Sequence, residues 1–182
     1  MSDEVGSDTT EEASESDDDG VPEPERRYGC LVSSGLDMAV LHPERDQWLP
    51  TMGALFSDGF DMCIDLTAVD YLTYDGQRRL PAGIEPERFE VVASFLCFER
   101  RERIRTKVQV PADDAVVASA TSVYPGADFL EREVFDLFGI EFADHPDLSR
   151  ILMPESWIGH PLRKDYATGA IPVQFKGAPG PR

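Results

Sequence analysis

Histidine and acidic side chains gather late in the chain, where residues of these types could hold a metal ion or act as a general base. His145 and His160 lie near Asp144, Asp147 and Glu155 in the sequence. These residues lack the His-Glu-x-x-His spacing that places two ligands on one helix face. Each histidine precedes a proline, which favours an extended backbone at that point. We therefore expect both imidazoles to hydrogen-bond to carboxylates or carbonyls and fix this segment, in preference to a metal or general-base role.

Other reactive side chains stand without the sequence context that their chemistry needs. Ser149 and Ser156 are not part of a Gly-x-Ser-x-Gly nucleophile elbow, and the sequence has no glycine-rich phosphate loop. Cys30, Cys63 and Cys97 are more than thirty residues apart, which matches neither a disulfide framework nor the ligand spacing of zinc or iron–sulfur sites. They indicate buried thiols in a reducing compartment.

A helix is predicted after the Pro125-Gly126 turn signal. Asp128 places a negative charge in its first turn, which the helix dipole favours. The helix is expected to end at Gly139, where a residue free to adopt positive φ is favoured. Its apolar stripe consists of Leu130, Val134, Leu137 and Phe138.

The charged side chains of this helix are expected on its surface. Asp128, Arg132 and Asp136 are four residues apart and can form a charge ladder. Glu131 and Glu133, with Asp136, could serve as an acid–base pair. Residues two apart do not share a helix face, so a surface charge network is predicted instead.

Residues 143–166, which we call the arm, cannot continue the helix. Pro146, Pro154 and Pro161 each remove a backbone donor. The arm is nevertheless rich in Leu, Ile, Met, Trp, Arg and His, unlike a flexible linker. This composition predicts an extended segment that needs a surface to lie on.

The arm and the preceding helix together resemble an assembly device. Arginine and lysine side chains here suit charge-assisted contacts across an interface. Tyr124, Trp157 and Tyr166 are interpreted as interface anchors in preference to a ligand cage. The predicted interface residues are Arg132, Glu133, Asp136, His145, Arg150, Trp157, His160, Arg163, Lys164 and Asp165.

The whole chain has the size and composition of one domain. It has 182 residues, of which 41% are hydrophobic, enough for a core. No run of eighteen apolar residues or secretory signal is recognised, so no membrane span is expected. The formal charge of −18 is uneven, because residues 1–25 hold eleven acidic and no basic residues, leaving 24 acids and 17 bases elsewhere. Nucleic-acid binding is not expected, since it needs clustered positive charge.

Both ends of the chain differ from the middle. Residues 1–27 are acidic and lack apolar periodicity, which predicts a disordered tail that is solubilising or, alternatively, regulatory. Residues 167–182 are rich in proline and glycine, while Ile171, Val173 and Phe175 alternate. That tail is either disordered or a strand added to another protein's sheet.

The middle of the chain predicts a small sheet with helices packed on it. A short strand is expected at residues 38–41, and a helix at 43–56 that stops near Gly59. Strands are predicted at 62–74, with a phase shift at Val69, at 89–98, buried on both faces, and at 104–110, with one wet face. The last two form an antiparallel hairpin. Asp113-Asp114 is expected to cap a further helix that ends near Thr121.

These elements predict an α+β fold, a small mainly antiparallel or mixed sheet with helices packed on it and an extended C-terminal arm. The expected organisation is a disordered acidic tail (1–27), an α+β domain (28–142), the interface arm (143–166) and a C-terminal tail (167–182).

Residues 124–166 closely resemble the signature of one family, the C subunit of respiratory NADH:quinone oxidoreductase (complex I). Residues Asp65–Tyr71 and the strand at Phe89 also resemble the upstream strands of that family. The family usually has Arg-Arg where this chain has Ser149-Arg150, and often Gly-His-Pro where it has Asp144-His145-Pro146. The matching residues are Glu131-Arg132-Glu133, Asp136, Phe138-Gly139-Ile140, Phe142, His145-Pro146-Asp147-Leu148, Arg150-Ile151-Leu152, Trp157 and Gly159-His160-Pro161-Leu162-Arg163-Lys164-Asp165.

The resemblance implies a non-catalytic peripheral-arm subunit with an α+β domain and no cofactor of its own. Its C-terminal segment would pack on the hydrogenase-like D subunit, near the B and I subunits. The complex would carry electrons from NADH through FMN and iron–sulfur clusters in partner subunits to quinone, coupled to proton translocation. The protein would lie peripherally on the cytoplasmic side of the cell membrane.

Two alternatives to this interpretation stay open. One is the equivalent scaffold subunit of a membrane-bound hydrogenase, or of a quinone-reducing complex with another electron donor. The other is a stand-alone metal-dependent hydrolase that uses His145 and His160.

Overall fold

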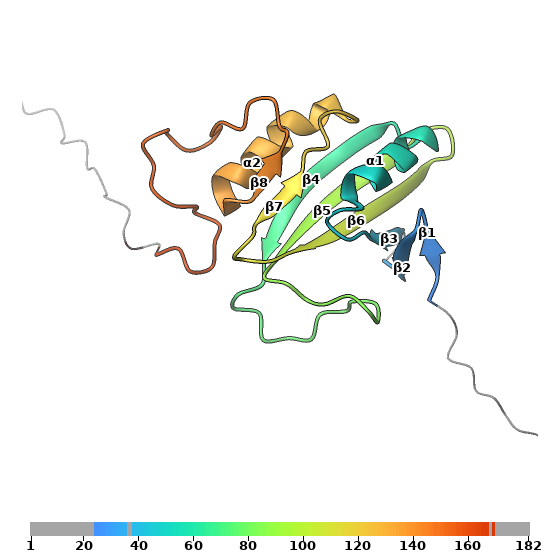
Figure 1. Ribbon diagram of the computed structural model, residues 1–182, viewed down its shortest axis with the longest axis horizontal. Coiled ribbons are helices and arrows are strands. Elements are labelled where there is room, and N and C mark those ends of the chain that lie inside the picture. The colour runs from blue at the N-terminus through green and yellow to red at the C-terminus, as the bar shows by residue number, and fades with distance from the viewer. Residues whose placement is uncertain (1–23, 36–37, 168, 170–182) are drawn as a thin grey trace, which may run out of the picture.

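Three long antiparallel strands form one half of a six-stranded mixed sheet (Figure 1). The computed structural model describes residues 24–35, 38–167 and 169. Across the sheet the strands run β1 (Arg26–Arg27), β2 (Cys30–Ser34), β3 (Ala39–His42), β6 (Glu102–Val110), β5 (Phe89–Cys97) and β4 (Met62–Asp70). Only the β3–β6 pair is parallel.

Two helices, α1 (Trp48–Ser57) and α2 (Asp128–Phe138), pack on one face of this sheet. A short 3-10 helix, η1 (Pro125–Ala127), leads into α2. The shared core contains Trp48 of α1, Val134 of α2 and the alternate side chains of β6 that begin with Ile104. This arrangement confirms the predicted α+β class, and the β5–β6 pairing confirms the predicted hairpin.

The alternation in β6 follows the prediction closely. Ile104, Thr106, Val108 and Val110 are buried against the helices, while the intervening residues point to the other face. In β5 the side chains on the helix face are all buried, whereas Val92, Ser94 and Leu96 on the other face are only half-buried. The prediction that this strand is buried on both faces is therefore wrong over its second half.

Helix α1 begins five residues later than predicted. Pro50 then falls in the first turn, where a missing backbone donor is tolerated. Gly59 terminates the turn with φ +84°, and its N–H donates to Phe56 O, as expected of the predicted stop. Strand β3 lies one residue beyond its predicted position.

Strand β4 has its irregularity in a different place from the prediction. The register shifts between Cys63 and Asp65, not at Val69. After this bulge Leu66, Ala68 and Asp70 alternate into the core. The extra residue of the bulge leaves Ile64 exposed.

The helix predicted after Asp113-Asp114 is wrong. This segment contains strand β7 (Val116–Ala118), which pairs in parallel with β8 (Glu141–Ala143) in a separate two-stranded sheet. β-branched Val116 and Val117 favour the extended conformation. Asp114 lies outside any helix and accepts hydrogen bonds from Arg45 at its carbonyl and carboxylate.

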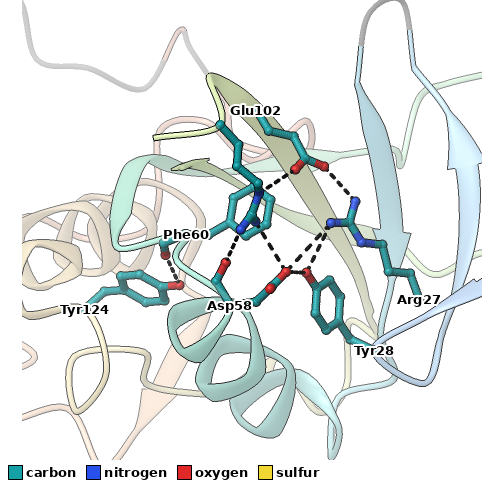
Figure 2. A network of polar contacts seen from close by, with 7 residues as sticks. Arg27, Tyr28, Asp58, Phe60, Glu102 and Tyr124 are labelled. Atoms are coloured by element: carbon teal, nitrogen blue, oxygen red, sulfur yellow. Dashed lines mark hydrogen bonds and ion pairs between the residues drawn. The ribbon is translucent and has the colours of Figure 1, made fainter. Parts of the chain in front are cut away.

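The start of the described chain is joined to the β5–β6 hairpin by charged groups (Figure 2). Arg27 Nη1 donates to Glu102 Oε1 at 2.8 Å, and the Tyr28 hydroxyl donates to Asp58. Arg100 donates to Asp58 O at 2.8 Å and pairs with Glu102. Strand β1 therefore lies within the predicted tail 1–27, while residues 1–23 of that tail lie outside the described residues.

The predicted C-terminal tail, 167–182, also lies outside the described residues except for positions 167 and 169. Its two alternative interpretations and the remaining domain boundaries stay predictions. Within the described ranges, neither helix has the length or the apolar content to cross a bilayer.

Candidate functional site

The arm runs from β8 along α2 and returns to the end of the central sheet (Figure 1, orange to red). Hydrogen bonds within the chain secure it at three places. Most of the residues that the sequence analysis assigned to an interface take part in the hydrogen bonds and ion pairs at these three places.

Asp136, on α2, secures the middle of the arm. Its buried carboxylate accepts from Arg150 Nη1 at 2.6 Å and from the backbone N–H groups of Ile151, Leu152 and Met153 at 3.1, 2.8 and 2.8 Å. Burial works to raise the pKa of Asp136, but these backbone and guanidinium donors outweigh it and lower that pKa. A single carboxylate thus orders four consecutive residues.

The C-terminus of α2 is the second place. Carbonyls of residues 136–139, which the helix itself leaves without donors, accept from the arm. His160 Nδ1 donates to Asp136 O at 2.9 Å, the Leu162 N–H donates to Leu137 O at 3.0 Å, and Arg163 donates to the next two carbonyls. Arg163 also places a positive charge at the negative end of the helix dipole.

His160 acts as a donor in this cap. Because a carbonyl oxygen only accepts, the proton of the neutral imidazole lies on Nδ1. Burial lowers the pKa of His160, and the nearby Arg163 and Arg150 lower it further. The hydrogen bond to Asp136 O confirms the predicted contact of this imidazole with a carbonyl.

Gly139 is required by both the helix and the arm. It terminates α2 with φ +68°, which confirms the predicted helix end. A Cβ atom at this position would lie 2.5 Å from His160 Nε2 and 2.7 Å from Arg163 Nη2. The close approach of the arm therefore depends on a residue without a side chain.

The third place is the end of β4. Buried Asp70 accepts from Arg88 Nε at 3.1 Å, from Arg88 Nη2 at 2.9 Å and from the Lys164 N–H at 2.9 Å. Arg88 Nη2 also pairs with Asp165 Oδ1 at 2.8 Å. Burial works to raise the pKa of Asp70, but the Arg88 and backbone donors lower it overall. Residues far apart in the sequence thus hold the last part of the arm.

His145 lies at the start of the arm with its side chain fully buried. Its Nδ1 accepts from the Asp147 N–H at 3.1 Å, so Nε2 carries the proton and faces Asp128 O at 3.3 Å. Glu131 Oε2 lies 3.9 Å from the same nitrogen. Within the described part of the chain, no three His, Cys, Asp or Glu side chains are close enough together to bind one metal ion.

The predicted surface charge network on α2 is wrong. Glu131 and Asp136 are fully buried. Glu131 accepts from Ser119 Oγ and from the Ala120 N–H, each at 2.7 Å, and burial raises its pKa. No ladder forms among the described residues either, because Arg132 donates to Ser149 O at 3.1 Å and to Ser149 Oγ at 3.0 Å.

The remaining predicted interface residues have different environments. Glu133 and Lys164 are exposed, and Asp165 is half-exposed while paired with Arg88. Trp157 is half-buried, and its Nε1 is buried without a hydrogen-bond partner among the residues described. The role of all these positions in contacts with another protein stays a prediction.

The arm also presents large apolar side chains to solvent, which the sequence analysis missed. The exposed fractions are 59% for Leu152, 89% for Ile158 and 47% for Leu162. Because prolines break the arm into short turns, these residues follow no periodic pattern that would reveal their orientation. The hydrogen bonds between the backbone of the arm and α2 determine which side chains of the arm face the solvent.

Comparisons with known proteins agree with this architecture. Residues 41–171 match the profile of the family described as respiratory-chain NADH dehydrogenase, 30 Kd subunit. A protein from Saccharopolyspora erythraea, named as the C subunit of NADH-quinone oxidoreductase, is 44% identical over 163 residues, covering 84% of this chain and 61% of that protein. One of the same name from Bordetella petrii is 40% identical over 154 residues, covering 79% and 74%.

The chain is shorter than these relatives. A third protein of that name, from Salinispora tropica, is 43% identical over 119 residues, which cover 65% of this chain and 44% of the relative. The chain therefore spans between 44% and 61% of two of these curated relatives.

Two solved structures share the fold. A trypsin-resistant fragment (1-134) of Nqo5 has a TM-score of 0.58 at 34% identity, covering 66% of this chain and 90% of that one. A chain of the membrane-bound sulfane sulfur reductase, an archaeal respiratory membrane complex, has a TM-score of 0.57 at 22% identity, covering 76% and 78%, a likeness of fold alone. Because the family profile covers more than half of its length, this chain belongs to the respiratory-chain NADH dehydrogenase 30 Kd subunit family.

Proposed function

We propose that this chain is a scaffold subunit of a proton-translocating NADH:quinone oxidoreductase and carries no redox centre itself. The names of its relatives support the complex. The observation that carries the scaffold role is the arm, whose polar groups bind the chain's own α2 and β4 while its apolar side faces outward.

The exposed side of the arm suits a protein partner. An apolar side chain as exposed as Ile158 gains free energy when a partner removes it from water. The backbone beneath it is already ordered by Asp136 and by the C-terminus of α2, so binding loses little conformational entropy there. A preordered apolar surface with a polar rim is typical of a stable interface.

The proposed partners are the D, B and I subunits of the same complex, with the arm against the hydrogenase-like D subunit. FMN and iron–sulfur clusters would belong to partner subunits, and NADH and quinone would be met only through the complex. The complex would transfer electrons from NADH to quinone next to this scaffold. The chain would then lie peripherally on the cytoplasmic side of the cell membrane.

Co-purification of the tagged full chain from its own cells tests this proposal. Ile158→Glu places a charge in the proposed interface, so we expect about tenfold less of the partner subunits to co-purify. The isolated variant should unfold like the parent within about 0.5 kcal/mol, because residue 158 is exposed. Phe98→Glu is a matched control, since Phe98 is 72% exposed but lies in the β5–β6 hairpin.

Each outcome of this experiment has a defined meaning. The proposal is supported if flavin-bearing subunits co-purify with the parent chain and are lost from Ile158→Glu. Recovery with a nickel-bearing large subunit would replace it by the hydrogenase alternative. Equal amounts of partner subunits with Ile158→Glu and Phe98→Glu would contradict the scaffold role of the arm. Recovery of the parent chain without any partner subunit would also contradict it.

A further inference from the structure

The face of the sheet opposite α1 and α2, which we call the outer face, is only partly covered. Near the end of β4, Arg78 of the 71–88 loop lies over it and donates to Glu90 at 2.8 Å and Gln109 at 2.6 Å. Toward the β5–β6 hairpin, Val92 and Leu96 are partly exposed, and Leu96 lines a surface hollow with Phe98 and Arg103. This part of the sheet has an open surface.

Positive charge follows strand β6 across this open part. Arg103, Arg105 and Lys107 alternate with the buried side chains of β6, and we call them the basic row. Arg101, in the hairpin turn, lines the same hollow as Leu96 and Arg103. Four cationic side chains thus lie on one side of one hairpin, although the chain as a whole is strongly acidic.

Most of these cations have no carboxylate partner among the described residues. Lys107 Nζ pairs with buried Glu90 at 3.1 Å, but Arg105 only reaches Ser94 Oγ at 3.4 Å. Arg101 and Arg103 take part in none of the ion pairs found within the described ranges. Arg100 of the same hairpin, in contrast, pairs with Asp58 and Glu102.

Acidic groups at the border of this surface do not neutralise it. Asp65 is opposite Ser94 in the β4–β5 register, one strand further from the basic row, and Glu99 lines the hollow at the hairpin. Neither forms an ion pair with the basic row among the residues described. The open part of the outer face therefore fits an acidic, extended occupant.

Such an occupant is present in this chain. Residues 1–23 contain ten acidic residues and no basic one. They join the described chain at Pro24, two residues before β1, and three strand spacings separate β1 from β6. That distance is about 14 Å, whereas ten extended residues span about 33 Å. The acidic segment can therefore reach the basic row with residues to spare.

We propose that the acidic segment 1–23 docks on the basic row of its own chain. Each ion pair at such a surface is weak, but the covalent connection raises the local concentration of acidic groups to the order of millimolar. Several weak pairs then form together without a unique register. Because the pairs are exposed, salt should weaken the docking strongly.

Zero-length carbodiimide coupling of carboxylates to lysine, mapped by mass spectrometry, tests the docking in the full chain. Arg103→Lys keeps the positive charge and supplies a reactive amine on the basic row. Glu133→Lys supplies an amine at another exposed position, on α2, on the opposite side of the sheet. We expect at least about fivefold more coupling of residues 1–23 to position 103 than to position 133, and loss of that excess in about 1 M NaCl.

The controls make either result decisive. Arg105→Lys repeats the measurement at a neighbouring position, and circular dichroism verifies that each variant is folded. Equal coupling at positions 103 and 133, or coupling that does not change with salt, would overturn the proposal. In a mixture of ¹⁴N- and ¹⁵N-labelled protein, coupling between chains in place of coupling within one chain would also overturn it.

Discussion

Two buried carboxylates on α2, Asp136 and Glu131, differ in what surrounds them. The Asp136 carboxylate is surrounded by groups that can donate but not accept a hydrogen bond, namely a guanidinium and three backbone N–H groups. Glu131 faces one backbone N–H and the hydroxyl of Ser119, which can donate or accept. The first site therefore requires an anion, while the second tolerates a neutral group, in agreement with opposite shifts of their pKa values.

This difference predicts effects of unequal size when each carboxylate is replaced by an amide. Asp136→Asn turns an NH₂ group toward donors, and we expect the free energy of unfolding at pH 7 to fall by about 2–4 kcal/mol. Glu131→Gln keeps every hydrogen bond if Ser119 accepts, so its effect should stay within about 1 kcal/mol. Urea denaturation of both variants measures the difference, with exposed Glu133→Gln as the control.

The response to pH follows from the sign of the shift. The pKa of Asp136 is lowered by folding, so the unfolded chain binds its proton more readily, and the stabilisation is lost as pH falls through the folded pKa. The difference in the free energy of unfolding between the parent and Asp136→Asn should therefore become smaller below about pH 4. A gap of the same size at pH 3 and pH 7 would contradict the assigned anion.

At the scale of elements, α2 and the arm stabilise each other. The last turn of α2 leaves carbonyls without donors, and the arm provides those donors while it has no regular structure of its own. Neither element satisfies its backbone groups without the other. The helix end and the arm should therefore unfold together.

Gly139 tests this coupling. Gly139→Ala meets both an unfavourable positive φ and the side chains of His160 and Arg163, so we expect a loss of about 3 kcal/mol. Gly29 also has positive φ but no atom within 4 Å of an added Cβ, so Gly29→Ala should lose only about 1–2 kcal/mol. Hydrogen exchange of the Leu162 amide should accelerate in Gly139→Ala and not in Gly29→Ala. Equal acceleration would mean that the arm does not depend on this contact.

At the scale of the whole molecule, the arm connects the helix layer to the far end of the sheet. Arg88 joins the two through Asp70 of β4 and Asp165 of the arm. The two carboxylates are 95 residues apart in the sequence, so this contact exists only in the complete fold. It holds Lys164 and Asp165 of the arm at the end of β4.

Removal of the Arg88 guanidinium should release that end of the arm. In Arg88→Met, buried Asp70 loses its charged partner, and we expect the free energy of unfolding to fall by about 3 kcal/mol. Exchange of the Lys164 amide, which donates to Asp70, should accelerate more than that of Leu152, which donates to Asp136. Arg79→Met, at an exposed loop position, serves as the control. Uniform acceleration along the arm would contradict three separate attachments.

The sequence by itself determined the features that depend on neighbours along the chain. Alternation in residues 104–110, the hairpin after residue 97, the end of α2 at Gly139 and the prolines of the arm all act over a few residues, where period and backbone preference decide the outcome. The family signature in residues 124–166 was likewise readable from the chain.

Only the tertiary structure decided what the polar residues do. Asp136 and Glu131 are of a residue type that usually lies on the surface. Their burial depends on donors from the arm and from the 119–120 turn, and the helical periodicity of α2 does not predict those donors. Val116–Ala118 became a strand because β8, more than twenty residues later, provides its partner. The free energy of a buried charge or an added strand depends on contacts between distant segments, and those contacts exist only after the chain has folded.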